Sequence, residues 1–383
     1  MNFFNEERLK KARQYRGWTV EELADRIGIT KQAISQYETG KIIPPIDKIL
    51  LFSQILNFPY KYFLQKDSND LKIGTTYFRS LQRTHKKHRV EQIVRMEHIS
   101  RLYSMIAHYV KFPSLDLPND YHFDNPEQAA HILREYWKLG NAPIDNLISI
   151  VEMHGIVVTT FPTSTDDIDA FSQFFRLGNM DIYVIGISSN KKSVARIHFD
   201  IAHELGHILL HDWSEDIESL SRLQFNEREK EANRFAAALL LPSDSFYKDI
   251  HGEYTTSLDY YKILKKKWKV SIAAMLYRAH KLSIISDNQY QYLMRSMQKR
   301  GWRKTEPLDN HLVTAPPSLF REAIALLLDN KIFSPKEVVE YFESTGLSMY
   351  PKELEILLNL EKDILEEPDN GIFKIVTLKP SSL

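Results

Sequence analysis

The spacing of apolar residues divides the chain into helical ends and a mixed middle. Residues 4 to 66 predict a compact run of short helices, because glycine, proline and polar residues interrupt the apolar spacing at regular intervals. Residues 67 to 140 predict further helix, and within them residues 86 to 109 run without proline or glycine. Residues 306 to 383 predict more helices and a possible final strand at Ile372 to Leu378.

The period of the pattern changes between residues 144 and 241. Two β-branched runs, Gly155 to Phe161 and Asp181 to Ile187, are bounded by turn-forming residues and predict strands. Residues 194 to 211 and 226 to 241 return to helical spacing, and Pro242 ends the second helix. We therefore expect a mixed domain with a small sheet in this part of the chain.

Composition narrows the possible chemistry. There is no cysteine, which excludes disulfides, thiolate nucleophiles and cysteine-rich zinc folds, so a transition metal would need histidine and carboxylate ligands. No apolar run approaches the length of a membrane span. The first residues also lack the basic and apolar segments of a secretion signal, so we expect a cytoplasmic protein.

Charge is unevenly distributed although the net charge is zero. Residues 1 to 66 carry 11 basic and 7 acidic side chains, and residues 260 to 304 carry 12 basic and 1 acidic. This segregation is typical of a protein with one side that faces a polyanion, although a basic run is also typical of a solvated helix face.

A possible metal motif lies in the first of the two central helices. His203 and His207 are four residues apart, so a helix places both imidazoles on one face, with Glu204 next to them. A catalytic zinc site needs a third protein ligand and an open fourth position. In the second helix Glu231 borders an apolar stripe and is preferred as the third ligand, because a carboxylate there is costly unless it is paired. Glu227 is the alternative.

Two further residues near the motif have two interpretations each. His211 lies four residues after His207 and could support it, but a histidine at the negative end of a helix is the favoured interpretation. Asn233 could bond a ligand or could equally be an exposed helix residue.

The string from Ala202 to His211, followed by Glu231-Ala-Asn-Arg-Phe-Ala-Ala-Ala-Leu-Leu-Leu-Pro242, resembles the ImmA/IrrE family of zinc metallopeptidases. The resemblance extends over about residues 144 to 307. It implies a gluzincin-like fold, a Zn²⁺ cofactor and endopeptidase activity. It also implies roles for four residues: zinc ligands at His203, His207 and Glu231, and the catalytic group at Glu204.

Residues 18 to 41 have the form of a helix-turn-helix. Thr19 and Thr30 are placed to cap its two helices, and Gly28 permits the turn between them. Ala33, Ile34 and Tyr37 form the buried side of the second helix. The residues left to contact DNA, by base edges or by phosphate, are Lys31, Gln32, Ser35, Gln36 and Lys41.

This segment resembles the XRE family of phage-repressor-like regulators over residues 4 to 64. The resemblance implies a double-stranded DNA operator of roughly palindromic sequence and a possible homodimer. A second interpretation is protein recognition, in which the domain guides the peptidase to another helix-turn-helix repressor.

Together these patterns predict a mostly α, α+β protein. We expect a helix-turn-helix domain at residues 1–66, a helical basic connector at 67–140, a peptidase domain with a small sheet at 141–305, and a helical C-terminal region at 306–383. The expected function is a DNA-binding transcriptional regulator that cleaves a regulatory protein in stress, phage or toxin-antitoxin-type control. The substrate would lie extended beside a sheet edge such as Asp181 to Ile187 and belong to another protein. The alternative is a repressor whose peptidase-like domain senses a ligand or partner and cleaves nothing.

Overall fold

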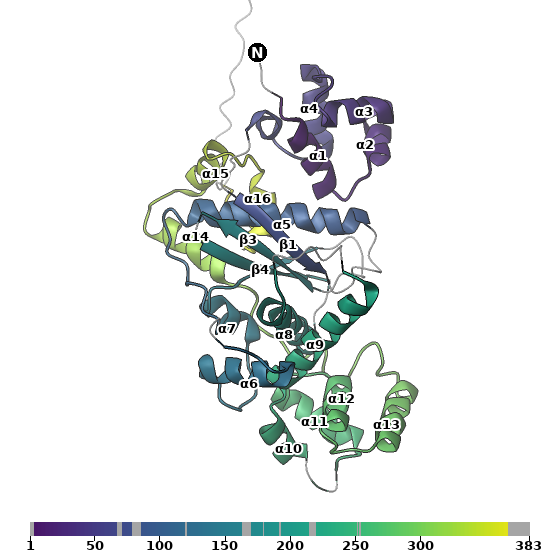
Figure 1. Ribbon diagram of the computed structural model, residues 1–383. Helices are drawn as coiled ribbons and strands as arrows, with labels where there is room; N and C mark the ends of the chain where they lie inside the picture. Colours follow the sequence, from purple (N-terminus) through teal and green to yellow (C-terminus); the bar gives the residue numbers. More distant parts are fainter. Residues whose placement is uncertain are drawn as a thin grey trace, which may run out of the picture.

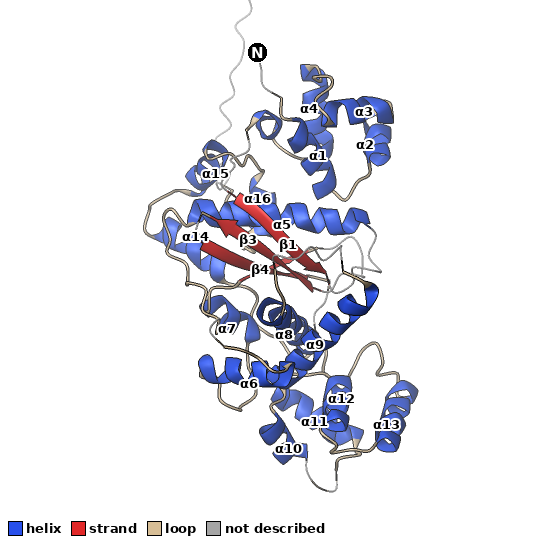
Figure 2. Cartoon of the chain, in the orientation of Figure 1, coloured by secondary structure: helices blue, strands red, loops and turns tan. Residues whose placement is uncertain are grey.

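The structure is a computed structural model that describes residues 4–66, 71–78, 86–118, 121–162, 170–178, 180–190, 193–213, 220–250, 252 and 254–366. Helices dominate these residues, and the strands belong to one small sheet near the middle of the molecule (Figure 1, Figure 2). The predicted fold class, α+β and mostly α, is confirmed. The strand predicted at Ile372 to Leu378 lies outside the described residues.

The N-terminal domain has the predicted helix-turn-helix. Thr19 and Thr30 each accept a hydrogen bond at the start of a helix, and Gly28 ends the first of these helices with a φ of 71°, as the sequence predicts. The elements of the domain are α1 (Glu6–Tyr15), α2 (Val20–Ile27), α3 (Lys31–Glu38), α4 (Ile46–Leu56) and the 3-10 helix η1 (Tyr60–Leu64).

The sheet has four strands in the order β1-β3-β4-β2, which are β1 (Leu71–Phe78), β2 (Val157–Phe161), β3 (Ala170–Leu177) and β4 (Met180–Ser188). Strand β3 pairs antiparallel with β1 and β4, whereas β2 pairs parallel with β4. The two predicted strands are present as β2 and β4.

Two expectations about this sheet are wrong. β1 lies in the segment that was predicted to be a helical connector, so this segment contributes an edge strand to the sheet. β4 has a partner on both sides, so the stretch from Asp181 to Ile187 is not an edge to which a substrate could add.

One face of the sheet packs against α5 and the C-terminal helices (Figure 1). The period-two alternation of a strand sends Ile182 and Val184 of β4 into this layer and Ile185 and Ile187 into the opposite one. The helices on this side are α5 (Lys86–Ile106), α14 (Leu319–Asp329), α15 (Pro335–Ser344) and α16 (Pro351–Leu357).

The opposite face packs against α8, which crosses α9, and the remaining helices extend away from the sheet (Figure 1). This half of the molecule has its own apolar core, in which Leu205, Phe235 and Trp268 are almost completely buried. Its helices are α6 (Pro126–Tyr136), α7 (Leu147–Met153), α8 (Val194–Leu210), α9 (Arg222–Leu240), α10 (Ser243–Ile250), α11 (Leu258–Trp268), α12 (Ile272–Lys281) and α13 (Asp287–Lys299).

The helix-turn-helix domain is docked on the sheet layer rather than suspended from a linker. Its apolar core continues into α5 and α16 without a break. Lys11 forms an ion pair with Glu97 of α5 at 2.6 Å, and Tyr15 donates a hydrogen bond to Glu353 of α16 at 2.8 Å. Residues 306–366 therefore join the N-terminal domain to the sheet.

None of the helices in the described part of the chain has the length and the apolar character that a membrane span requires.

Candidate metal centre and nucleic-acid interface

The candidate metal centre lies where α8 crosses α9. The two helices approach closely because position 206 is glycine: a Cβ there would lie 3.1 Å from the Cα of Ala232 and 3.1 Å from a ring carbon of Phe235. Ala232 is completely buried at the crossing. This close approach places the α8 histidines directly opposite the first half of α9.

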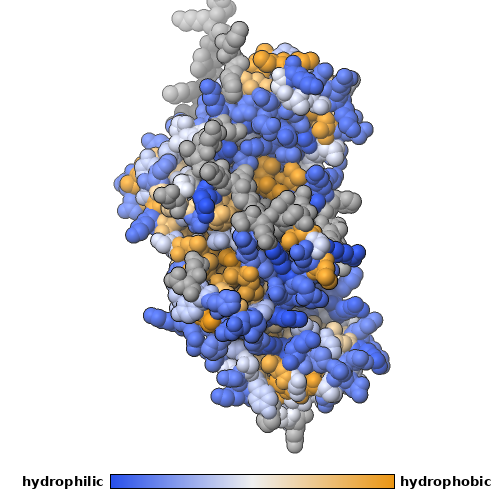
Figure 3. Space-filling view, in the orientation of Figure 1, coloured by the Kyte–Doolittle hydropathy of each residue, from blue (hydrophilic) through white to orange (hydrophobic). Residues whose placement is uncertain are grey.

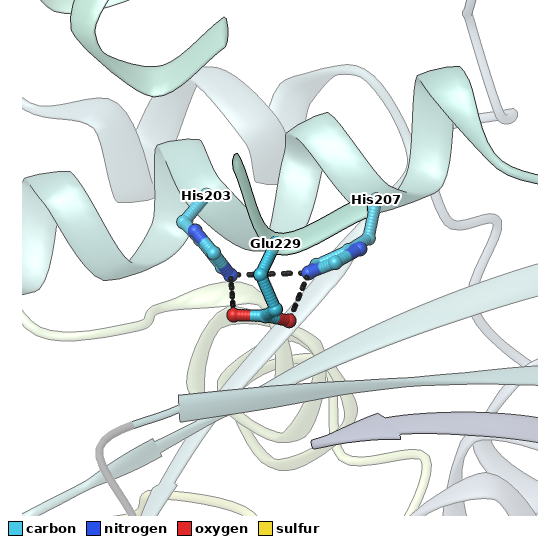
Figure 4. Close-up of side chains that lie close together, drawn as sticks. All are labelled: His203, His207 and Glu229. Atoms are coloured by element: carbon cyan, nitrogen blue, oxygen red, sulfur yellow. Dashed lines mark hydrogen bonds and ion pairs between the residues drawn. The ribbon is translucent and has the colours of Figure 1, made fainter. Parts of the chain in front are cut away.

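Two histidines and one glutamate converge at the crossing (Figure 4). The Nε2 atoms of His203 and His207 are 3.0 Å apart. The carboxylate of Glu229 spans both, with Oε2 3.4 Å from His203 Nε2 and Oε1 3.1 Å from His207 Nε2. Both imidazoles are buried, and the Glu229 side chain is 16% exposed.

These three residues fit a zinc ion. Ligand atoms that lie about 2.0–2.1 Å from zinc in a tetrahedral shell are separated from one another by about 3.3 Å. The two imidazole nitrogens, 3.0 Å apart, are close to one edge of such a tetrahedron, and one ligand atom from each of the three residues lies within 4.8 Å of the other two. Two imidazoles and one carboxylate leave a fourth position open, which is the ligand set of a catalytic rather than a structural zinc site.

The carboxylate that lies in this cluster is Glu229, whereas the sequence analysis expected Glu231 as the third zinc ligand. Glu231 Oε2 lies 3.1 Å from His211 Nε2, and its side chain is 43% exposed. Glu229 shares a face of α9 with the buried residues Phe225 and Ala232, and this is the face that meets α8. The alternative ligand, Glu227, is half exposed and pairs with Lys230 at 2.6 Å.

Each metal-facing histidine is held through its other ring nitrogen. His203 Nδ1 lies 3.2 Å from Asn233 Oδ1, and His207 Nδ1 lies 2.9 Å from His211 Nδ1. Of the two interpretations of His211 and Asn233, support of the neighbouring histidines is therefore the one that the structure favours.

These contacts determine which ring nitrogens carry protons. An amide oxygen only accepts, so His203 Nδ1 donates to Asn233 and leaves the Nε2 lone pair for a metal. The Glu231 carboxylate accepts from His211 Nε2, so His211 Nδ1 accepts from His207 Nδ1. In this tautomer His207 Nε2 also carries a lone pair that can bind a cation. Glu231 thus acts on the cluster through His211.

Electrostatics agree with this assignment. Burial raises the pKa of Glu229, but the His203 and His207 imidazoles beside its carboxylate outweigh this effect and hold the pKa well below its ordinary range. Burial and the neighbouring His207 lower the pKa of His211, which keeps its imidazole neutral. The site therefore presents an ionised Glu229 carboxylate, which is the protonation state that a metal ion requires of such a ligand.

Glu204 is completely buried and points to the sheet rather than into the cluster of three ligands. Its Oε2 accepts a hydrogen bond from Ser172 Oγ, on β3, at 2.5 Å. Ser172 was not found in the sequence because its strand was not predicted. This contact ties the base candidate to the sheet.

The recognition face of the N-terminal domain has the predicted composition. Lys31, Gln32 and Ser35 are exposed on α3, Gln36 is half-buried beside them, and Lys41 is exposed just after the helix. On the opposite side of α3, Ile34 is completely buried in the domain core. The structure thus turns the predicted DNA-contacting side chains toward solvent on one face.

Comparisons with known proteins divide the chain in the same way. Residues 9–63 match the helix-turn-helix family, and residues 151–280 match the family described as IrrE N-terminal-like domain. The second match includes His203, His207 and Glu229. The chain therefore joins an XRE-type helix-turn-helix domain to an IrrE-like, metallopeptidase-like domain.

The curated relatives match short stretches of this chain. The HTH-type transcriptional regulator YqaE of Bacillus subtilis (strain 168) is 36% identical over 64 residues, which are 17% of this chain and 55% of that protein. The SPbeta prophage-derived HTH-type transcriptional regulator YonR of the same organism is 37% identical over 59 residues, 15% of this chain and 55% of that protein. The chain spans about half the length of the curated relatives it matches.

Proposed function

We propose that this chain, with its helix-turn-helix and IrrE-like domains, is a cytoplasmic DNA-binding regulator with zinc-dependent endopeptidase activity that cleaves a regulatory protein. One observation carries the peptidase part: two histidines and a glutamate converge within 4.8 Å of one another, and the residue after the first histidine is a buried glutamate. Control of stress, phage or toxin-antitoxin-type genes is the biological setting we infer, in line with the prophage origin of one relative.

The chain's residues have distinct roles in the proposed reaction. His203, His207 and Glu229 would hold the zinc ion, which when bound would supply Lewis acidity toward the peptide carbonyl and the attacking water. Glu204 takes the proton of the attacking water and later delivers it to the leaving amine. Ser172 orients Glu204 by its hydrogen bond, and Asn233 and His211 hold the two imidazoles in the required tautomers.

The proposed substrate belongs to another protein. Self-cleavage within residues 86 to 106 would require the unfolding of α5, a 21-residue helix whose Met96, Ile99 and Leu102 are buried against the sheet. Because ordering entropy and core burial both oppose this unfolding, a foreign segment is the more accessible substrate. Another helix-turn-helix repressor is the substrate class that we favour.

The proposed DNA partner is an operator read by two copies of the chain. Ile42, Ile43, Ile46 and Leu50 are exposed next to α3 and at the start of α4, and apolar atoms gather over this end of the molecule (Figure 3). Asp47 and Lys48 lie within this patch, so a two-fold axis through it would pair opposite charges as well as apolar side chains. A homodimer of this kind would present two α3 helices to a palindromic site.

The decisive experiment for the peptidase compares the wild type with Glu204→Gln. We expect one zinc ion per chain in both proteins, because the substitution leaves the three ligands in place, and cleavage of a partner repressor by the wild type alone. Mass spectrometry of the mixture gives the cut site. If both proteins cut equally, or if neither cuts any protein encoded by the neighbouring genes, the domain is a non-cleaving sensor.

The DNA assignment has its own test. We expect Gln32→Ala or Gln36→Ala to weaken binding to the specific operator by about 1–3 kcal/mol, because each removes hydrogen bonds to a base edge. Lys41→Ala should weaken binding to all duplexes alike, because it removes a phosphate contact. Fluorescence anisotropy with the operator and with a scrambled duplex separates the two effects. An unchanged sequence preference in the Gln32→Ala, Gln36→Ala protein would exclude this orientation of α3.

A further inference from the structure

We propose that a cavity between α8, α9 and α12 binds a small anionic molecule with a planar apolar part, and that this ligand acts on the metal centre through Asn233. The cavity has a volume of about 580 Å³, which is in the range of sites for small organic ligands. The binding part of this proposal stands alone, whereas the action on the metal centre rests on the proposed function.

The charge of the cavity wall favours an anion. Lys230 and Arg234 project from α9, four residues apart, and Lys281 projects from the end of α12. Lys230 also forms an ion pair with Glu227. Among the described residues, those that line the cavity include no acidic side chain. Three cations around one hollow attract a negatively charged ligand more strongly than isolated surface lysines do.

The floor of the cavity favours a planar apolar group in the same ligand. Ala237, Ala273 and Ala274 leave the space open because their side chains are small, and Phe199 and Tyr277 supply aromatic surface. Inorganic phosphate alone would leave this apolar surface unused. A molecule that joins a carboxylate, sulfonate or phosphate to an aromatic ring would place its acidic group near the cations and its ring against the apolar and aromatic side chains.

The first backbone N–H groups of α12 do not contribute to anion binding, because they already have acceptors. Ile272 N and Ala273 N donate to the Glu306 carboxylate, and Ala274 N donates to Ser271 Oγ. Selectivity for the anion therefore depends on Lys230, Arg234 and Lys281. This makes the site open to test by charge-reversing substitutions.

Asn233 connects the cavity to the metal centre. It lines the cavity, and its Oδ1 lies 3.2 Å from His203 Nδ1. It also stands four residues after Glu229, on the same face of α9. A ligand that contacts the Asn233 amide changes how firmly His203 is held, so its binding and zinc binding are coupled, and by linkage each alters the affinity of the other.

The probe for this site is the aromatic sulfonate 8-anilinonaphthalene-1-sulfonate, titrated into the full chain and followed by fluorescence. We expect one saturable component with one dye per chain. Arg234→Glu and Lys281→Glu should each weaken it by about tenfold or more, which corresponds to about 1.4 kcal/mol, and Ala274→Trp should abolish it by filling the cavity. The matched control is the Lys262→Glu, Lys266→Glu protein, which reverses two exposed charges on α11, away from the cavity.

Several outcomes would overturn the proposal. Dye affinity that is unchanged in the cavity variants, or that falls equally in the α11 control, excludes the cavity as the site. Displacement of the dye by inorganic phosphate as effectively as by an aromatic carboxylate excludes the planar part of the ligand. A poly-glutamate peptide that binds there in preference to the dye would assign the cavity to a protein segment instead.

The coupling has a separate readout that does not use proteolysis. We expect the rate of zinc loss to a chelator to change when the dye is bound, and Asn233→Ala to remove this effect while dye binding persists. An unchanged rate at saturating dye overturns the coupling. Dye binding is also measured on the metal-free chain. A cavity that does not bind the dye can therefore be distinguished from an incorrect assignment of the domain as a zinc peptidase.

Discussion

Two glutamates on α9, separated by Lys230, have different partners on α8. Glu229 faces the imidazoles of both His203 and His207, whereas Glu231 contacts His211, which in turn contacts His207. A helix turns by about 100° per residue, so residues two apart cannot share one ligand position. In the proposed zinc site, Glu229 is therefore a direct ligand, and Glu231 supports the ligand His207 through His211.

This division predicts two different effects on zinc. Glu229→Gln removes a ligand and should lower zinc affinity by more than about a hundredfold, beyond the range of about 10–100-fold that is typical for the loss of a supporting residue. Glu231→Gln should fall within that lower range, because His211 loses a charged acceptor but remains in place. Competition with a chromophoric chelator at neutral pH measures both.

Glu227→Gln is the control for these variants, because Glu227 is half exposed and forms an ion pair with Lys230. It should leave zinc affinity unchanged. If Glu231→Gln lost zinc and Glu229→Gln kept it, Glu231 would be the third ligand, as the family resemblance implies, and Glu229 would not bind zinc.

At this scale, the sequence predicts the residues that one helix brings together and misses those that depend on a second element. His203, Glu204 and His207 lie within five residues, so helical periodicity alone places them. The choice between Glu229 and Glu231 depends on the rotation of α9 against α8, because both residues border apolar stripes. Ser172 reaches Glu204 from β3, and no local spacing relates the two.

At the scale of elements, the crossing of α8 and α9 positions the whole metal centre. Gly206 lies between the two histidines on α8 and faces Ala232, which lies between the ligand Glu229 and Phe235 on α9. A side chain at the crossing would separate the two helices, and with them the three ligands. Gly206 therefore determines both the packing of the two helices and the relative positions of the three proposed ligands.

Gly206→Ala is expected to affect stability and zinc binding together. The added Cβ would lie 3.1 Å from the backbone of Ala232, which cannot move aside as a flexible side chain can. We expect overpacking to lower the free energy of unfolding by about 1–3 kcal/mol and the shift of Glu229 to weaken zinc binding. Urea unfolding of the metal-free protein and chelator competition report the two effects.

The control is Asn226→Ala, an alanine substitution at an exposed position of α9, which should leave both measurements unchanged. A fully stable Gly206→Ala protein with normal zinc affinity would show that the two helices have room to spare at their crossing, contrary to the packing described above.

Strand prediction depended on how continuous each apolar run is. β2 and β4 were predicted because both contain β-branched runs bounded by turn-forming residues. β3, with Ser172 and Gln173 among its aromatic residues, has a weaker signal, and β1 contains a glycine within a segment that is otherwise basic and helical in pattern. β1 obtains its partner from a strand a hundred residues away, which no local window detects.

At the scale of the whole molecule, the helix-turn-helix domain docks on the helices that cover one face of the sheet. The domain shares a buried core with α5, and His98 of α5 lies at the centre of this contact. His98 Nδ1 donates to Val94 O at 2.7 Å, and its Nε2 accepts from the Tyr62 hydroxyl at 3.1 Å. The rings of Tyr15 and Phe58 pack against the imidazole.

The expectation of a separate domain at residues 1–66 followed from its self-contained helical pattern. That pattern places Ile34 correctly in the core. It does not show that buried polar groups on α1 reach residues more than three hundred positions later, as Tyr15 does with Glu353. Contacts of that sequence separation leave no periodic signal in either segment, so only the folded chain reveals them.

The docking of the two parts is expected to weaken in mild acid because of His98. Burial lowers the pKa of His98 from 6.5 to about 4, against the opposing effect of Glu97 and with small contributions from Arg101 and Arg8. The unfolded chain binds this proton near pH 6.5 and the folded chain only near pH 4, so the unfolded state holds more protons between these values. The free energy of unfolding therefore falls as the pH falls from about 6.5, by about 3 kcal/mol in total for a depression of this size.

Urea unfolding of the wild type and of His98→Gln at pH 7, 6 and 5 measures this contribution, with both proteins metal-free. Glutamine retains a polar side chain at the interface but does not titrate, so the variant should be less stable at pH 7 and should lose less stability on acidification. The difference between the two proteins isolates His98, because the other titrating histidines, including those of the metal centre, are common to both. Parallel pH dependences would mean that the imidazole is protonated within the fold at no cost, and that the contact between α5 and Tyr62 does not depend on its neutral form.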